Sequence, residues 1–203
     1  MASDVAIIGL GYVGLPLAEE ASRVGLKVLG FDVSQRVVDG LNAGRSHVDD
    51  LSDGDVLRAG DLEVRVVATP GHTADSVSFA LAADHALLTG DTVLGRGTTV
   101  VAHPDGQLAA YLDSLERIKA LTGDGAVATI LPGHGPTVPD AAAMVDFYRV
   151  HRRERLDQVR AAMAEGARDA DAVVATVYAD VDRSVWPAAK MSVLAQMRFL
   201  ESA

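Results

Sequence analysis

The chain is organised around three short peptides: Thr69-Pro70-Gly71-His72-Thr73, Thr89-Gly90-Asp91-Thr92 and Leu131-Pro132-Gly133-His134-Gly135. Each peptide follows a run of apolar, often β-branched residues, breaks at Gly or Pro, and presents one His or one Asp. Strand ends are rigid, so the loops just beyond them can converge on one point. Imidazole and carboxylate are the usual ligands of zinc and other divalent metals. A lone His after a strand is more often a surface residue, but the repeated pattern predicts a metal site formed by His72, Asp91 and His134.

Composition narrows the functional classes. The 203 residues carry a formal net charge of -10, which argues against nonspecific nucleic-acid binding because neutralising phosphates requires a basic face. There is no cysteine, so neither disulfides nor thiolate metal sites are available. The N-terminus has no signal-peptide pattern, and no run approaches the roughly 20 apolar residues of a membrane span. We therefore expect a soluble, cytoplasmic protein with no membrane partner.

The first 44 residues follow the order strand, helix, strand, helix. An apolar run of strand length, residues 5–8, leads directly into Gly9-Leu10-Gly11-Tyr12-Val13-Gly14. Helical spacing of apolar residues continues to about Val24, and residues 27–31 form the second strand. A second helix is expected to begin at Ser34, which acts as its N-cap.

The glycine pattern stands where a dinucleotide-binding fingerprint requires it, between a strand and a helix. The first glycine would permit a tight turn, the second the approach of a pyrophosphate, and the third close contact between helix and strand. Asp32, after the second strand, would bind the ribose hydroxyls and favour NAD over NADP. Alternatively, the glycines only tighten a turn between strand and helix. The predicted cofactor-binding residues are Gly9, Gly11, Tyr12, Val13, Gly14 and Asp32.

The rest of the chain alternates strands with helices. An amphipathic helix is predicted over residues 107–121, and Pro139 at a first helical position starts a long helix. The basic run over residues 151–155 is expected to be a solvated helix face, with contact to an acidic ligand or to RNA as the alternative. Strands are expected at residues 62–67, 76–81, 86–88 and 127–131, and further helices near 169–178 and 188–202.

Three stretches carry a resemblance to a known family: Gly90-Asp91-Thr92-Val93-Leu94-Gly95, Gly97-Thr98-Thr99-Val100-Val101 and Val185-Trp186-Pro187-Ala188-Ala189. With them, the sequence from about Asp53 onward resembles the C-terminal half of the metallo-β-lactamase-fold hydrolases, in particular the β-lactamase-like-protein-2 branch. The resemblance implies that His72 binds a first metal, that Asp91 bridges two metals, and that His134 binds the second.

Those hydrolases also carry an upstream His-x-His-x-Asp-His signature, which this sequence lacks. The only upstream histidine is His47, which with Asp49 and Asp50 would replace the missing ligands only by accident. His103, in a loop near the presumed metal face, is a further candidate for a ligand or a substrate contact. A catalytic metal usually needs three protein ligands and an open position for water. The sequence therefore predicts a reduced metal site, and a single ion held by the three main candidates is the alternative.

The first part of the chain resembles a different family. Gly9 to Ala18, together with Gly30-Phe31-Asp32-Val33, resembles the N-terminus of the UDP-sugar and GDP-mannose dehydrogenases, and the likeness runs from Val5 to about Asp53. Those enzymes use a catalytic cysteine. Because this chain contains no cysteine, the resemblance implies nucleotide binding without the oxidation chemistry.

The two resemblances indicate a designed or selected chimera joined near residue 53, with a divergent natural protein as the alternative. The predicted fold is an α/β layered sandwich that combines a Rossmann-type βαβα fragment, residues 1–53, with the C-terminal half of a metallo-β-lactamase fold. That half, residues 54–203, ends in a helical tail from about residue 140. Neither fragment can bury its sheet alone, so one merged folding unit is expected. An imperfect fit would favour a homodimer or strand exchange.

Three functions compete at this point. The favoured one is residual binding of a nucleotide such as NAD or ADP, or of zinc or another divalent metal, without efficient catalysis. The alternative is a metal-dependent hydrolase that cleaves an ester, thioester or phosphodiester at the reduced metal site. The third is a folded chain with no activity.

Overall fold

The computed structural model describes residues 3–11, 14–42, 53–59 and 61–202. Its first unit comprises β1 (Val5–Ile8), α1 (Gly14–Arg23), β2 (Val28–Phe31) and α2 (Gln35–Asn42). The two strands pair in parallel, from Val5 opposite Val28 to Ile8 opposite Phe31. The predicted element order is confirmed. The predicted cap is confirmed too, because the Ser34 hydroxyl accepts a hydrogen bond from the Val37 amide at 3.4 Å.

A five-stranded sheet forms the centre of the molecule. Its strands are β3 (Val56–Ala59), β4 (Leu62–Ala68), β5 (Val77–Leu81), β6 (Ala86–Gly90) and β7 (Thr129–Pro132), in that spatial order. Neighbours are antiparallel except β6 and β7, which are parallel. The C-terminal ends of β4, β6 and β7 therefore meet at one edge of the sheet, and this edge receives all three signature peptides.

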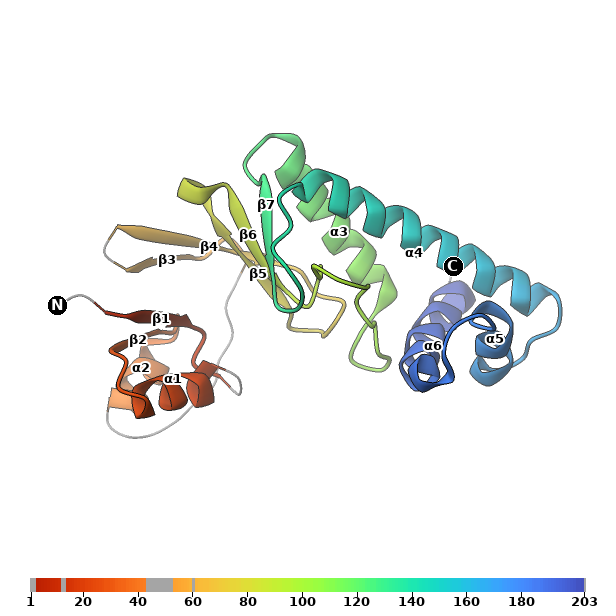
Figure 1. The fold of residues 1–203 in the computed structure, drawn as a ribbon, viewed down its shortest axis with the longest axis horizontal. Coiled ribbons are helices and arrows are strands. Elements are labelled where there is room, and N and C mark those ends of the chain that lie inside the picture. The colour runs from red at the N-terminus through yellow and green to blue at the C-terminus, as the bar shows by residue number, and fades with distance from the viewer. Residues whose placement is uncertain (1–2, 12–13, 43–52, 60, 203) are drawn as a thin grey trace.

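Two helices cover one face of this sheet (Figure 1): α3 (Leu108–Gly123) and α4 (Ala141–Ala164). Leu87 and Ile130 of the sheet pack there against Tyr111, Leu115 and Ile118 of α3. Leu87 and Ile130 are both 0% exposed, and burying each contributes roughly 1.5–3 kcal/mol. The amphipathic stripe predicted for residues 107–121 is therefore confirmed.

The start of the long helix α4 differs from the prediction. Asp140 is its N-cap, and its carboxylate accepts a hydrogen bond from the Ala143 amide at 2.9 Å. Pro139 therefore precedes the cap instead of occupying the first helical position. A side chain that accepts a hydrogen bond satisfies a free helical amide, which proline at the first position cannot do.

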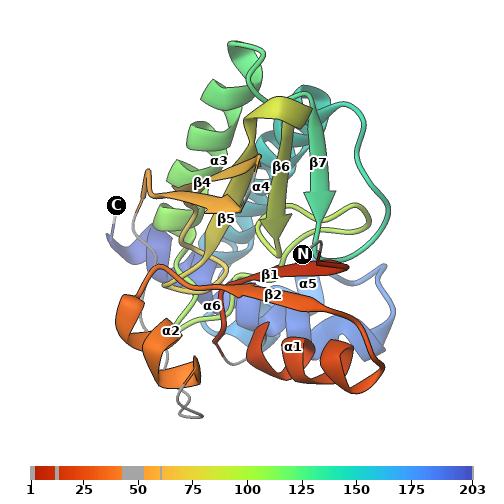
Figure 2. The ribbon, with the colours of Figure 1, turned by 90° about the vertical axis from the view of Figure 1, so that its left-hand side faces the viewer.

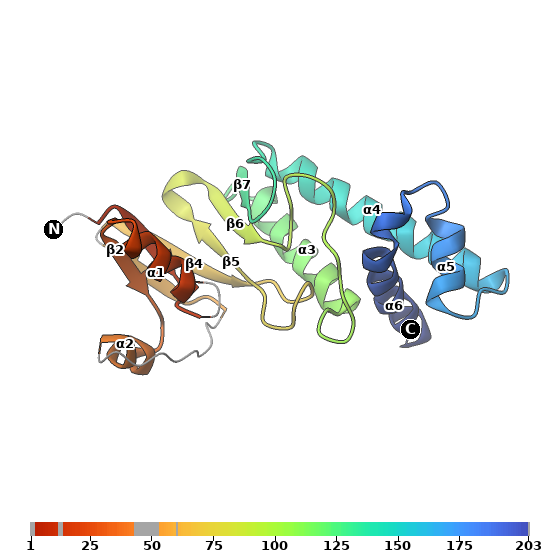
Figure 3. The ribbon, with the colours of Figure 1, turned by 60° about the horizontal axis from the view of Figure 1, so that its bottom comes forward.

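The C-terminal helices form a second, smaller core with the end of α4. They are α5 (Ala170–Val177) and α6 (Trp186–Ser202). Two short 3₁₀ segments lie between elements: Ala82–Asp84 between β5 and β6, and Arg183–Val185 directly before α6. Val159, Val173 and Val193 are each 0% exposed in this core. Figure 3 shows the resulting row of first unit, sheet and helices. Within the described residues, no helix is both long and apolar enough to cross a membrane.

The first unit faces the side of the sheet opposite α3 (Figures 1 and 2), with α1 and α2 turned away from it. Among the described strands, β1 and β2 form a separate two-stranded sheet and pair with none of the other five. A cavity of about 850 Å³ lies between the two sheets. The first unit consequently covers the apolar face only in part, and Leu17 and Leu29 stay exposed.

Candidate functional site

The three predicted metal ligands meet at the edge where β4, β6 and β7 end. His72 Nε2 lies 3.7 Å from Asp91 Oδ2, and His134 Nε2 lies 3.5 Å from Asp91 Oδ1. Each carboxylate oxygen of Asp91 thus faces a different imidazole. The His134 side chain is 75% exposed, whereas those of His72 and Asp91 are 30% and 37% exposed. The site therefore opens to solvent on the His134 side.

The orientation of the His72 ring is fixed by the backbone. Its Nδ1 lies 2.7 Å from the Val100 carbonyl oxygen. A carbonyl only accepts, so Nδ1 carries a proton and Nε2 is the ring nitrogen that faces Asp91. Metal-binding histidines are commonly held in this way by a hydrogen bond at the nitrogen that does not ligate.

A network of buried hydroxyls holds the turn that carries Asp91. The Thr99 hydroxyl donates to the Asp91 carbonyl at 2.7 Å and lies 3.1 Å from the Thr92 carbonyl. The Tyr111 hydroxyl donates to the Thr92 carbonyl at 2.6 Å. These bonds reach the turn from two separate segments, the loop after Gly97 and helix α3. The backbone of Asp91 is therefore positioned independently of its carboxylate.

Arg152 of α4 contacts two members of this network, a role that the sequence analysis did not predict. Its guanidinium donates to the Thr99 carbonyl and lies 4.8 Å from the centre of the Tyr111 ring. The residue is only 7% exposed, and its Nε has no hydrogen-bond partner among the described residues. Burial raises the pKa of Tyr111, an effect that the neighbouring Arg152 charge opposes. The phenol therefore remains a neutral donor.

The basic run over residues 151–155 is thus not a uniformly solvated face. Arg153 is exposed, but Arg152 points into the protein, because successive residues of a helix project about 100° apart. His151 stacks on Phe147 at 5.9 Å between ring centres. The pKa of His151 is lowered, mainly by partial burial of the ring and to a lesser extent by the positive charges of Arg152 and Arg155.

Removing the Thr99 hydroxyl tests the network. Thr99→Val keeps the shape of the side chain but leaves the Asp91 carbonyl without its donor, so we expect the free energy of unfolding to fall by about 1 kcal/mol. Zinc should also bind more weakly, because the Asp91 turn is less restrained. Denaturant unfolding and zinc titration measure the two effects. In the control, Thr122→Val, the lost hydroxyl bonds only to the Lys119 carbonyl within α3, and a smaller change is expected. Equal losses in both variants would contradict the assignment.

The donor set fits a divalent metal in type but not in number. Asp91 offers one oxygen beside each imidazole, so each of two ions would receive two side chains. Catalytic zinc usually has three protein ligands. In the described part of the chain, no group of three or more His, Asp, Glu or Cys side chains could hold one ion. The single-ion alternative is therefore not supported, and the three residues do not form a complete catalytic metal centre. His47, Asp49 and Asp50 lie outside the described residues.

The glycine loop lies beside this edge without joining it. Gly9, Gly11, Gly14 and Asp32 line the 850 Å³ cavity, as does Pro70, two residues before His72. None of the three candidate metal ligands lines it. Tyr12 and Val13 lie outside the described residues.

The Asp32 carboxylate has backbone hydrogen-bond partners both in the glycine loop and in its own loop. It accepts hydrogen bonds from the Leu10 amide at 3.2 Å and the Ser34 amide at 3.1 Å. Asp32 therefore ties the glycine loop to the start of α2.

Comparison with known proteins identifies the family. The model of the metallo-beta-lactamase superfamily matches residues 13–137, more than half of the chain. The chain belongs to the metallo-β-lactamase superfamily. A model of the beta-lactamase associated winged helix domain also matches residues 170–203, which contain α5 and α6 of this superfamily member.

Relatives agree with this assignment over part of their length. The beta-lactamase-like protein 2 homolog of Drosophila melanogaster is 35% identical over 141 residues, which are 68% of this chain and 45% of that protein. The homolog of Caenorhabditis elegans is 39% identical over 105 residues, 52% of this chain and 33% of that protein. This superfamily member therefore spans less than half the length of these two relatives.

A solved structure shows the same fold. A beta-lactamase domain protein from Burkholderia ambifaria superposes with a TM-score of 0.74 at 23% identity, covering 98% of this chain and 68% of that one. The superposition includes nearly the whole chain. The match to the superfamily model begins at residue 13, within the glycine loop, and includes α1, β2 and α2. The comparisons therefore give no support to a dehydrogenase fragment or to a chimera joined near residue 53.

Proposed function

We propose that this chain is a metal-dependent hydrolase of the metallo-β-lactamase superfamily that uses a reduced metal site. The observation that carries the proposal is the placement of one Asp91 oxygen beside His72 and the other beside His134. Membership of the superfamily supports it. So does a relative named atrochrysone carboxyl ACP thioesterase, from Aspergillus chevalieri, which is 36% identical over 116 residues, 57% of this chain and 35% of that protein.

The substrate class we propose is an ester, a thioester or a phosphodiester. His72, Asp91 and His134 would hold zinc or other divalent ions, which would polarise a carbonyl or phosphoryl oxygen and lower the pKa of bound water. The chain's own part is to fix the ligands: the Val100 carbonyl orients His72, and Thr99 holds the Asp91 turn. Because each ion would receive only two of these side chains, we expect weak metal binding and slow hydrolysis.

Metal removal and return test this proposal. Protein stripped with a chelator should bind added zinc in calorimetry, and zinc should raise the hydrolysis of p-nitrophenyl acetate or bis(p-nitrophenyl) phosphate above the metal-free rate. His134→Ala should reduce both effects. The control His85→Ala should reduce neither, because His85 is exposed at the opposite end of β6. A protein that binds no zinc, or hydrolysis that is the same with and without zinc, would overturn the proposal.

As a second candidate function, the first unit would act as a Rossmann-type fragment and bind the ADP part of NAD. The cavity beside Gly9, Gly11 and Asp32 favours it, since its volume of about 850 Å³ is in the range of small-molecule sites. Gly14 also meets the requirement for a small residue, because a Cβ there would lie 1.7 Å from the Gly9 carbonyl oxygen. A chimeric origin would explain such a fragment. The division into residues 1–53 and 54–203, and a homodimer, stay predictions.

Calorimetric titration distinguishes this candidate from the first. If the cavity takes a nucleotide, ADP and NAD should bind metal-free protein, and Asp32→Ala should abolish binding because the glycine loop loses its tie to α2. Asp39→Ala, which removes an exposed acid on α2, should leave binding unchanged. No heat and no thermal shift with either nucleotide would remove the candidate.

A further inference from the structure

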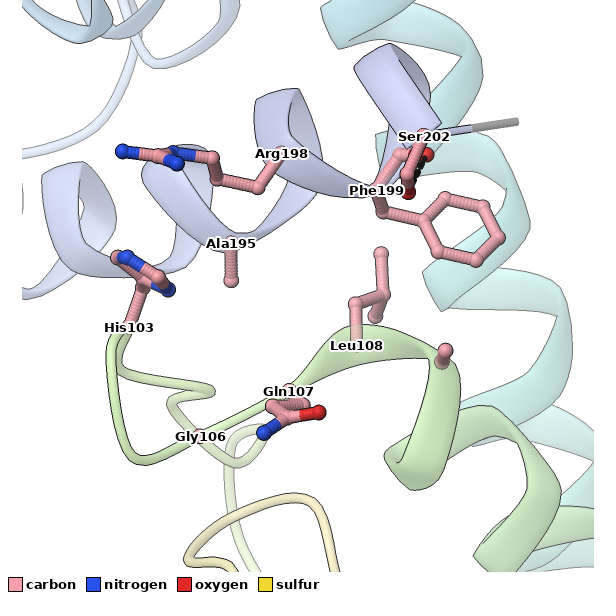
Figure 4. Close-up of a pocket in the computed structure, with 9 residues that line it drawn as sticks. His103, Gly106, Gln107, Leu108, Ala195, Arg198, Phe199 and Ser202 are labelled. Atoms are coloured by element: carbon pink, nitrogen blue, oxygen red, sulfur yellow. Dashed lines mark hydrogen bonds between the residues drawn. The ribbon is translucent and has the colours of Figure 1, made fainter.

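A second cavity lies between the loop that precedes α3 and the C-terminal helix α6. Its volume is about 270 Å³, and its walls come from His103, from residues 106–109 and from the last turns of α6. The two walls are far apart in sequence, and they bring the helical tail against the domain that carries the metal edge. Figure 4 shows Ala195 of one wall and Leu108 of the other directed into the space between them.

One end of this cavity is cationic. Arg198 of α6 and His103 of the facing loop lie at the same end (Figure 4). In the described residues, neither side chain has a hydrogen bond or an ion pair. Among the described residues that line the cavity there is no aspartate or glutamate, although the chain as a whole has a net charge of -10. An anion would therefore find the positive charge of Arg198 there, with no carboxylate among the described lining residues.

The rest of the cavity is apolar. Ala195 forms its middle, and Leu108 faces Phe199 at the end away from the arginine (Figure 4). Leu108 and Ala195 are 3% and 4% exposed, so this floor is set by the core and not by mobile surface side chains. A ligand with a charged head and an apolar body matches this division, because its head would remain near solvent while its body leaves water.

The cavity is separate from the metal edge, but the loop that lines it packs against the loop that carries His72. The Gln107 amide donates to the Gly71 carbonyl at 3.0 Å, and a Cβ on Gly106 would lie 2.8 Å from the His72 carbonyl oxygen. No residue is shared with His72, Asp91 and His134. Binding in the cavity can consequently be measured without any metal.

We propose that this cavity binds a small organic oxyanion, a carboxylate or a phosphate carried on an apolar body, with the oxyanion between Arg198 and His103. The apolar body then lies over Ala195, between Leu108 and Phe199. The ligand is small: a cavity of about 270 Å³ takes a single ring or a short acyl chain. This site goes beyond the proposed hydrolysis and does not depend on it.

Binding of defined probes to chelator-treated protein tests the proposal. Benzoate and phenyl phosphate distinguish a carboxylate from a phosphate head, and for ligands of about ten heavy atoms we expect a Kd on the order of 1 mM for the preferred one. Acetate and inorganic phosphate have the charge without the ring, and benzyl alcohol has the ring without the charge. Each of these three should bind at least about 10-fold more weakly, because both ends of the cavity contribute. NMR shifts should locate the bound probe at the amides of Gly106 and Gln107.

Arg198→Gln should weaken binding of the preferred probe about 10-fold or more without changing the melting temperature, because the side chain is exposed and unpaired in the described structure. Arg168→Gln removes the same charge from an exposed loop and should have no effect. The proposal is overturned if neither aromatic probe binds below 20 mM, if inorganic phosphate binds as well as phenyl phosphate, or if the two arginine variants behave alike. Zinc is absent throughout, so none of these outcomes bears on the metal site.

Discussion

Gly71→Ala should destabilise the protein by about 3–5 kcal/mol, a large part of the 5–15 kcal/mol that holds a typical domain folded. Gly71 has a backbone φ of +134°, a value that residues with a side chain rarely adopt. A Cβ there would also lie 2.3 Å from the Tyr111 Cα and 2.4 Å from the Tyr111 nitrogen. Because both atoms belong to the backbone of α3, the helix itself would have to move. The displaced loop carries His72, so zinc binding should be lost as well.

Gly97→Ala is the matched control for this substitution. Gly97 also has a positive φ, +74°, but a Cβ there would meet no atom within 4 Å. Its cost should be about 1–2 kcal/mol, the conformational penalty alone. Chemical denaturation measured on both variants separates strain from collision. Equal losses of stability would show that α3 yields to the added methyl group.

Asp91→Asn should weaken zinc binding by about 100-fold or more while leaving the fold intact, since even the loss of an outer partner of a metal ligand costs about 10–100-fold. Within the described structure, the ion pairs of the Asp91 carboxylate are those with the two histidines, and its backbone is held by Thr99. The amide is neutral and offers one oxygen, so it cannot serve both imidazole sites. Zinc calorimetry and a thermal melt measure the two properties.

Asp113→Asn controls for overall charge. Asp113 is an exposed acid on α3, and its replacement changes the net charge by the same amount without touching the metal edge. Zinc affinity should be unaltered in this variant. If both substitutions weakened zinc binding equally, the ion would be attracted by the acidic surface as a whole and not held at Asp91.

The predictable parts of this structure depended on local patterns. Apolar spacing predicted α3, and Ser34 predicted the start of α2, because both signals act within one or two turns. The convergence of His72, Asp91 and His134 followed from strand ends that meet at one edge. These features needed no knowledge of distant contacts.

The missed features depend on tertiary packing. The strand at residues 56–59 lies on the edge of the sheet and has only four residues, too few for a clear alternation. Arg152 belongs to a run of charges that is typical of a solvated face, and only the contact with Thr99 and Tyr111 shows that it is buried. The glycine fingerprint is a short motif, and the model of the metallo-β-lactamase superfamily covers the helices that follow it.

The parallel pairing of β6 with β7 sets an order for assembling the site during folding. Residues 69–91 bring His72 and Asp91 together through consecutive antiparallel neighbours, which close over short lengths of chain. His134 reaches them only after residues 91–128, including all of α3, have crossed over the sheet. Contacts between residues distant in sequence form more slowly because a long loop must close first. Refolding should therefore bring the second imidazole beside the carboxylate last, so that metal capture reports completion of the native topology.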